Sequence, residues 1–282
     1  MLVNMKGMLA DAAAGGHAVG GFNFASLESG VGAIRASEEL GIPFILEHTP
    51  AHEEYCPFDI AAPIMVQLAR SAATPVAAHL DHGDSVELCV KALHLGFSSV
   101  MFDGSALPYE ENIRQTAIVC RVAHAVGATV EAELGSMPHN LKGELGDYAP
   151  EDFYTDPEQA RRFVAETGVD ALAISFGTVH GVYKTAPRLS FGVIDAVRQA
   201  TGDLPLVMHG GSGLSADDYR QAIGRGIRKI NYYTYGAIAA GEAVRRLAGA
   251  ADGRLMFHDV AVCATQAVCD DVKRVMRLFK PQ

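Results

Sequence analysis

The sequence has no tryptophan, only five cysteines and no long apolar run. The cysteines are scattered and none belongs to a CxxC pair: Cys56, Cys89, Cys120, Cys263 and Cys269. This usage is typical of free thiols in a reducing cytoplasm rather than of disulfides or a cysteine metal site. No stretch reaches the about 18 uninterrupted apolar residues of a membrane helix. The first six residues also lack the apolar core of a secretory signal, so we expect a cytoplasmic protein with no membrane partner.

Positive charge is scarce as well. The chain has 23 Lys and Arg against 33 Asp and Glu, which gives a net charge of −10. This balance argues against nucleic acid and anionic membranes as partners. An anionic substrate would need a local positive pocket. Apolar residues, in contrast, make up 49% of the 282 residues, which is enough for a large core.

Apolar runs alternate with amphipathic, helix-like segments along the chain, without an intervening linker. We expect strands at residues 17–24, 42–48, 75–80, 98–103, 128–133, 170–175, 204–208 and 227–232. These runs are continuous rather than alternating, as a parallel sheet buried on both faces requires. The pattern predicts an α/β fold, a single (β/α)8 TIM barrel with an extra C-terminal helix, as one domain over residues 1–282.

Helix starts and long connections support this division. Ser26 is a predicted helix cap, Asp156 precedes a proline at the first helical position, and Ser215 has the form of a capping box. The connections 134–155 and 176–189 are long for a compact barrel, and the first has the length of a lid or binding loop.

Three histidines follow three of the predicted strands: His82, His180 and His209. The strands of a parallel barrel all open onto one face at their carboxyl ends, and the chemistry sits there. A single histidine at a strand end is more often a hydrogen-bonded structural residue, but three on one face favour a shared metal. Three imidazoles form an open site for Zn²⁺, with a position left for a substrate oxygen.

Carboxylates lie beside these histidines. Asp81 is a candidate proton carrier, or a charge that orients the ligands. Glu131 and Glu133 are two apart on the fifth strand and share a side; Glu133 is the candidate for the metal region, with a role in an interior hydrogen-bond network as the alternative. His79 is expected in the barrel interior or behind the ligands, and His48 is a candidate substrate contact.

Phosphate-binding elements follow the last two strands. Gly210, Gly211 and Ser212 precede a helix start, where backbone N–H groups can face an anion. Asn231 and Thr234 follow the eighth strand, and barrels often bind phosphate after strands seven and eight. Gly181 and Lys184 of the sixth loop could complete this pocket.

Together these segments resemble the zinc-dependent class II ketose-bisphosphate aldolases, the fructose- and tagatose-bisphosphate aldolase family. The resemblance covers residues 1–235 and rests on Phe22-Asn23, His79-Leu80-Asp81-His82, Ser99 to Ser105, Val130 to Gly135, Gly177 to Gly181, His209 to Leu214 and Lys229-Ile230-Asn231.

The resemblance implies a role for each matching residue. It makes His82, His180 and His209 the zinc ligands and Asp81 the proton donor to the aldehyde oxygen. It places dihydroxyacetone phosphate against Gly181, Gly210 to Ser212, and Asn231 to Thr234. With Asp81, we assign Glu133 and Asn231 to the catalytic group, and Asn23 and Lys184 to substrate binding. It also implies a monovalent cation, Na⁺ or K⁺, near the phosphate, and a homodimer or homotetramer.

Four segments depart from the family pattern. Tyr232 and Tyr233 replace a small or acidic pair, and residues 137–144 lack the expected Gly-Gly-x-Glu-Asp, with Glu144 as a candidate substitute. Residues 47–49 carry an acid that would disfavour a second substrate phosphate, and the chain after about 236 differs. The half of the site that would bind dihydroxyacetone phosphate therefore matches the family pattern more closely than the half that would bind the aldehyde.

Three functions remain open at this point. The first is reversible cleavage of a ketose 1-phosphate or 1,6-bisphosphate, with fructose or tagatose bisphosphate as the default, to dihydroxyacetone phosphate and an aldehyde such as glyceraldehyde 3-phosphate. The second keeps dihydroxyacetone phosphate but pairs it with a non-phosphorylated, deoxy or sulfonated aldehyde. The third is a metal- and phosphate-binding barrel with little catalysis.

Overall fold

Eight parallel strands close into a barrel in a computed structural model that describes residues 1–135, 139–140, 150–183, 187–251 and 253–280. The strands are β1 (Val19–Asn23), β2 (Phe44–His48), β3 (Val76–Gly83), β4 (Ser99–Phe102), β5 (Thr129–Leu134), β7 (Ala171–Ile174), β9 (Leu206–Met208) and β10 (Ile227–Tyr232). Around the barrel the order is β1-β10-β9-β7-β5-β4-β3-β2. Each predicted strand overlaps one of these strands, although β3 and β5 end three residues and one residue later than predicted, so the barrel expectation is confirmed.

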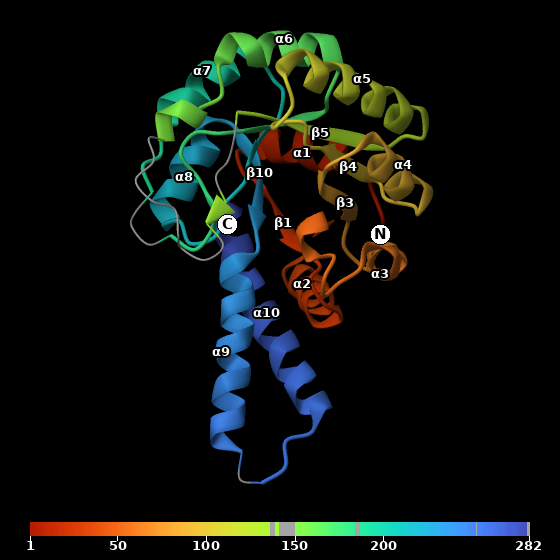
Figure 1. The fold of residues 1–282 in the computed structure, drawn as a ribbon. Coiled ribbons are helices and arrows are strands. Elements are labelled where there is room, and N and C mark those ends of the chain that lie inside the picture. Colours follow the sequence, from red (N-terminus) through yellow and green to blue (C-terminus); the bar gives the residue numbers. More distant parts are fainter. Residues whose placement is uncertain (136–138, 141–149, 184–186, 252, 281–282) are drawn as a thin grey trace.

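Helices surround the barrel and alternate with the strands (Figure 1). They are α2 (Leu27–Leu40), α3 (Phe58–Ser71), α4 (Val86–His94), α5 (Tyr109–Ala125), α6 (Pro157–Thr167), α7 (Phe191–Thr201), α8 (Ala216–Arg225) and α9 (Thr234–Ala250). An additional helix α1 (Met5–Gly15) precedes the barrel, and α10 (Phe257–Phe279) follows it as the predicted extra C-terminal helix. Short elements lie in the loops: the 3-10 turns η1 (Pro50–His52) and η2 (Pro150–Phe153), and the paired strands β6 (His139–Asn140) and β8 (His180–Gly181).

The predicted helix caps are present. The Ser26 side chain accepts a hydrogen bond from the backbone N–H of Ser29, and Ser215 does the same from Asp218. Asp156 caps α6, with a proline at the first helical position. Such caps satisfy backbone donors that have no partner inside the helix, so they fix where each helix leaves the loop above the barrel.

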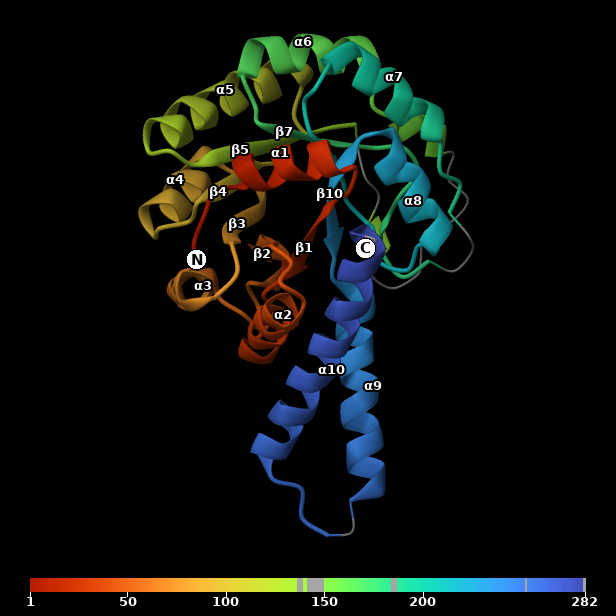
Figure 2. The ribbon, with the colours of Figure 1, turned by 180° about the vertical axis from the view of Figure 1, so that it is seen from behind.

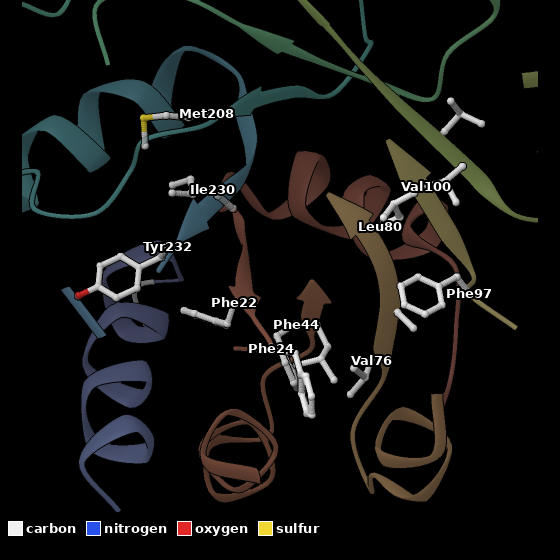
Figure 3. Packing of buried hydrophobic residues seen from close by; sticks show 14 of the residues in the cluster. Phe22, Phe24, Phe44, Val76, Leu80, Phe97, Val100, Met208, Ile230 and Tyr232 are labelled. Atoms are coloured by element: carbon white, nitrogen blue, oxygen red, sulfur yellow. The ribbon is translucent and has the colours of Figure 1, made fainter. Parts of the chain in front are cut away.

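The core has two parts. Between strands and helices lies a continuous apolar layer, to which Phe22, Phe44, Val76, Leu80 and Ile230 belong (Figure 3). Inside the barrel, small and medium side chains fill the end at which the strands begin, and α1 closes this end (Figure 2). The members of this inner cluster are Met5, Met8, Leu9, Ala12, Val19, Ile45, Ala77, Met101, Ala171, Ala173 and Val207. The opposite end of the interior is therefore left to polar side chains.

Helices α9 and α10 form a hairpin that extends away from the barrel (Figure 1). We call residues 234–279 the arm. The base of the arm packs on α2, where a Cβ at Gly32 would lie 2.9 Å from the Thr265 carbonyl oxygen. Toward its tip, Phe257 is 83% exposed and Val262 is 66% exposed. Within the described residues, no helix combines the length and apolarity needed to cross a membrane.

Candidate metal and phosphate site

The three predicted metal ligands converge above the carboxyl ends of the strands. One ligand atom from each of His82, His180 and His209 lies within 4.8 Å of the other two. His82 Nε2 is 3.0 Å from His209 Nδ1. The ring centroid of His82 is 5.0 Å from that of His180 and 4.6 Å from that of His209. These imidazoles can hold one ion between them.

His82 owes its position to an irregularity in β3. Its φ is +51°, and it is the single non-glycine residue with positive φ within the described ranges. The register between β3 and β4 shifts between Leu80 and Gly83, as at a β-bulge. Bulges re-aim side chains next to active sites, and a strained conformation at such a position persists only where surrounding contacts enforce it. The strand thus runs past the predicted end at residue 80, and the bulge turns His82 toward His209.

Hydrogen bonds fix both rings. His82 Nδ1 lies 2.7 Å from an Asp103 carboxylate oxygen, which leaves Nε2 for a metal. Burial disfavours the imidazolium form of His82, but Asp81, Asp103 and Glu133 together raise its pKa to about 10. These three carboxylates supply negative charge that a divalent cation would neutralise, and metal binding would displace the proton from His82. Carboxylate partners of this kind orient metal-ligating histidines and increase their basicity.

His209 directly follows β9, and a carboxylate inside the barrel fixes the orientation of its ring. Its Nε2 is 2.9 Å from Glu131 Oε1, so Nδ1 faces His82. Burial lowers the pKa of His209, which favours the neutral ring that ligation requires. Glu131 in turn lies 2.8 Å from the Lys229 ammonium, which is also 2.7 Å from Glu47. The side chains of Lys229, Glu47 and Glu131 are fully buried inside the barrel.

His180 reaches the site from a loop. The chain turns after β7 at Gly177, which has a φ of +112°. His180 and Gly181 then form β8, which pairs in parallel with β6. The ring of His180 lies 5.8 Å from that of His209, centroid to centroid. This ligand therefore depends on loop structure rather than on a barrel strand.

Asp81 lies beside the histidines with two amide partners. Asn231 Nδ2 donates to one carboxylate oxygen at 3.0 Å, and Asn23 Nδ2 to the other at 3.4 Å. The carboxylate is 3.9 Å from His82 Nε2. Burial opposes its ionisation, but His82, His209 and Lys229 hold the pKa of Asp81 well below its usual range. It is thus an ionised, oriented acceptor next to the metal position.

Glu133 lies beneath the histidines. Its Oε2 is 3.5 Å from His209 Nδ1 and 3.9 Å from His82 Nδ1. Burial and the nearby Asp103 raise the pKa of Glu133 to about 8. The carboxyl group therefore joins the metal region and does not line the open pocket described next.

A pocket of about 260 Å³ opens above these groups. Besides Asp81, His82 and His180 it is lined by the predicted substrate residues Asn23, Gly181, Gly210, Gly211, Ser212, Asn231 and Thr234. Gly210 has a φ of +63°, and a Cβ there would lie 2.4 Å from the Val179 carbonyl oxygen. Only glycine lets the loop after β9 pass this close to the loop carrying His180. Ser212 Oγ accepts from the Tyr233 backbone N–H at 2.9 Å, which leaves its own O–H for an anion.

Some expectations are not met. His48 does not line the pocket above the histidines: its Nε2 lies 2.7 Å from the Cys56 carbonyl oxygen, and its ring packs on Phe58. The Glu47 carboxylate, expected to disfavour a second substrate phosphate, points into the barrel instead, where Lys229 pairs with it. Lys184, Glu144 and most of the loop 134–155 lie outside the described residues.

Sequence reasoning missed one wall of the pocket. His52 and Tyr55 line it from the loop after β2, together with Tyr233. We noted Tyr233 as a departure from the family, but η1 and the following turn have no periodicity that would reveal which way their side chains face. The sequence offered one signal for this wall, namely that the loop directly after the second strand carries the ring side chains His52 and Tyr55.

The fold and the site together define a (β/α)8 barrel of the metal-dependent aldolase class. The family model of the class-II fructose-bisphosphate aldolases matches residues 3–282, so the chain belongs to this family. Members are carbon–carbon lyases, and zinc dependence is a general property of the family.

Similar proteins agree with this assignment. A probable fructose-bisphosphate aldolase of Bacillus subtilis (strain 168) is 41% identical over 282 residues, which cover 99% of this chain and 97% of that protein. A fructose-bisphosphate aldolase of Staphylococcus aureus (strain Mu50) is 41% identical over 248 residues, 86% of this chain and 85% of that protein. The crystal structure of the YdjI aldolase from Escherichia coli K12 matches with a TM-score of 0.87 at 36% identity and covers 99% and 97% of the two chains.

Proposed function

We propose that this aldolase reversibly cleaves a ketose 1-phosphate or 1,6-bisphosphate to dihydroxyacetone phosphate and an aldehyde. Fructose and tagatose 1,6-bisphosphate, which would release glyceraldehyde 3-phosphate, are the first substrates to assay. The observation that carries the proposal is the position of Asp81 beside three convergent histidines, in the same pocket as the glycine loop at Gly210 and Ser212. The names of the relatives support the same substrate class.

The metal position fits zinc. His82, His180 and His209 offer three nitrogen donors, and carboxylates around them favour a cation. A bound zinc ion supplies Lewis acidity, which stabilises the negative charge that develops on substrate oxygens when the carbon–carbon bond breaks. We propose zinc rather than cobalt or manganese on the basis of donor chemistry and family membership.

Side chains and backbone groups of the protein carry out proton transfer, orientation of the carboxylate and phosphate binding. Asp81 accepts the proton of the C4 hydroxyl as the C3–C4 bond breaks, and returns it in the condensation direction. Asn231 and Asn23 hold this carboxylate in place. The Gly210–Ser212 loop, Gly181 and Thr234 bind the phosphate, so that the non-reacting end of the substrate positions the reacting end. Glu133 balances charge at the ligand histidines, and Na⁺ or K⁺ near the phosphate belongs to the same proposal.

The proposal is tested by coupled detection of dihydroxyacetone phosphate, with zinc-loaded and chelator-stripped enzyme. Asp81→Asn should lower kcat by at least about 100-fold, the usual contribution of a positioned proton carrier, while zinc content stays unchanged. Asp203→Asn, at an exposed turn, is the matched control and should keep full activity. Failure of every ketose phosphate to release dihydroxyacetone phosphate would contradict the proposal and favour the non-catalytic alternative.

We further propose that residues 1–282 form one domain of a cytoplasmic homodimer or homotetramer. The five cysteines are free thiols, of which Cys89 and Cys120 are deeply buried, as suits a reducing compartment. Exposed apolar side chains at the arm tip, Phe257 and Val262, support association between copies. Light scattering of the purified protein measures the oligomeric state directly.

A further inference from the structure

One side of the catalytic pocket is built from three ring side chains that come from two separate loops. The ring centroid of His52 lies 4.7 Å from that of Tyr233 and 5.3 Å from that of Tyr55. The two phenol oxygens are 3.3 Å apart. His52 is only 3% exposed, whereas Tyr55 is 56% exposed at the pocket rim. We call these three residues the aromatic wall.

The barrel order tells which half of a substrate meets this wall. The loops after β7 and β9 carry Gly181, Gly210 and Ser212, the groups suited to a phosphate. Asp81 stands on β3, which pairs with β2, and the wall residues His52 and Tyr55 follow β2. A chain that runs from the phosphate loops past the histidines to Asp81 therefore continues toward the wall. Since the bond to be broken lies at Asp81, His52 and Tyr55 face the portion released as the aldehyde. Tyr233 follows β10 beside Thr234 and joins these two rings to the phosphate side, because its N–H donates to Ser212.

The chemistry of the wall is neutral. Burial, and the nearby His48, lower the pKa of His52 to about 4. Burial and the Tyr233 hydroxyl raise the pKa of Tyr55 above its usual range. The pocket-lining residues in the described part of the chain include no lysine or arginine. The exposed acidic residues Glu53 and Glu54 directly precede Tyr55 in sequence.

These groups suit a hydroxylated carbon chain better than a second phosphate. Two phenols and an imidazole supply hydrogen-bond donors and acceptors together with ring faces that pack on C–H groups. A phosphate dianion, in contrast, is recognised by cationic side chains or by convergent backbone N–H groups. Neighbouring carboxylates repel it.

We propose that His52, Tyr55 and Tyr233 determine specificity at the aldehyde half of the site, and that they select an uncharged, hydroxylated aldehyde. The preferred substrate is then a ketose 1-phosphate without a second phosphate. This inference rests on the proposed aldolase function and narrows its substrate class. The wall residues position the substrate and carry no proton in the reaction.

The decisive measurement compares kcat/KM for fructose 1-phosphate and fructose 1,6-bisphosphate, and for the two tagatose phosphates, by release of dihydroxyacetone phosphate. We expect the monophosphate to be favoured by at least about tenfold for one of the two sugars. Equal or better cleavage of both bisphosphates overturns the inference but leaves the proposed function intact. No dihydroxyacetone phosphate from any of the four sugars overturns both, so the two failures are distinguishable.

Variants at the exposed member of the wall test its role separately. Tyr55→Phe should raise KM for the ketose 1-phosphate by about fivefold, the usual loss for one hydrogen bond, with little change in kcat. In the condensation direction, KM for dihydroxyacetone phosphate should stay constant. Tyr55→Lys should move the monophosphate-to-bisphosphate ratio of kcat/KM toward the bisphosphate by about tenfold or more. The control is Val126→Lys, at a position 67% exposed after α5; a ratio unchanged in Tyr55→Lys would overturn the assignment.

Discussion

His82 and His209, two of the candidate metal ligands, each contact a carboxylate through the nitrogen that faces away from the metal position. Asp103 holds Nδ1 of His82, and Glu131 holds Nε2 of His209. These bonds select which nitrogen is offered to the ion and keep each ring in one orientation. We therefore expect the metal affinity of the candidate site to depend on residues that do not contact the metal.

Replacing Asp103 should expose this dependence. Asp103→Asn keeps the size of the side chain but removes the charge that stabilises the ring orientation of His82. We expect zinc affinity to fall about 10- to 100-fold, the usual effect of losing such a partner. Competition with a zinc chelator measures it, and Asp203→Asn, at an exposed turn before β9, is the control. Unchanged affinity in Asp103→Asn would show that packing alone orients His82.

The buried charged side chains inside the barrel include more carboxylates than ammonium groups. Lys229 is the shared partner of Glu47 and Glu131, so two buried carboxylates compete for one ammonium. Lys229 and His209 overcome the effect of burial on Glu131 and lower its pKa to about 2. Burial instead raises the pKa of Glu47 to about 8, although Lys229 partly offsets this. Glu47 is thus the member that holds a proton at neutral pH.

This proton makes stability depend on pH in a definite direction. A carboxyl whose pKa is higher folded than unfolded stabilises the fold below its unfolded value of about 4.3, and loses this effect as pH rises through about 8. We expect the free energy of unfolding to decrease between pH 7 and 9. Glu47→Gln should make this decrease shallower, while Glu133, with a pKa also raised to about 8, keeps part of it. Urea unfolding across this range tests the slope; an unaltered slope in Glu47→Gln would place the titrating proton elsewhere.

The sequence predicted that His82, His180 and His209 lie together because strand ends in a parallel barrel share one face, a rule that needs no side-chain detail, and the structure brings the three rings together. It also placed Asp81 and the Gly210 loop, since both lie directly beside predicted strands. His48 shows where such reasoning stops. It ends β2 as expected, but a bond to the Cys56 carbonyl turns its ring away from the pocket. The turn that makes this bond has no pattern in the sequence.

At the scale of elements, strand positions were predictable because each barrel strand is buried on both faces and carries a mainly apolar run. The third strand was predicted too short, since the run after Leu80 becomes polar at Asp81. The structure continues β3 to Gly83 through the bulge at His82. Polar residues extend this strand because they serve the site rather than the core. Helix contacts such as that of α10 with α2 were not predictable, because they pair segments more than 200 residues apart.

The α2–α10 contact depends on the absence of a side chain at Gly32. A Cβ there would approach Val268 Cγ1 to 2.8 Å and the Thr265 carbonyl oxygen to 2.9 Å. Gly32→Val should therefore separate the helices and lower the free energy of unfolding by about 1–3 kcal/mol, the usual effect of overpacking. The control is Gly7→Ala in α1, where a Cβ would meet nothing within 4 Å; it should stabilise the protein by up to about 1 kcal/mol. Urea unfolding that ranks the two variants in the opposite order would contradict this account of the interface.

At the scale of the whole molecule, the barrel and the arm differ in how fully they bury apolar surface. The barrel encloses both of its core layers, whereas Gly236 is the only buried residue in α9. Tyr232, at the end of β10, links the two parts, because its hydroxyl donates to Asp271 of α10 at 2.8 Å. The arm is thus anchored next to the candidate active-site pocket, which Tyr232 also lines, while its tip presents Phe257 and Val262 outward. Large exposed apolar side chains on a projecting element are typical of a surface that a second copy covers.

The tip of the arm gives the test of assembly. If copies associate through it, Phe257→Glu places a charge in the interface and should shift the mass measured by light scattering toward that of the monomer. The shift should grow as the protein is diluted. Val126→Glu introduces the same charge at a 67% exposed position after α5 and should leave the mass unchanged. Because Phe257 itself is 83% exposed, the substitution removes little intramolecular packing, and the midpoint of urea unfolding of the dilute protein should stay the same. An oligomer that persists in Phe257→Glu would assign association to a surface of the barrel instead.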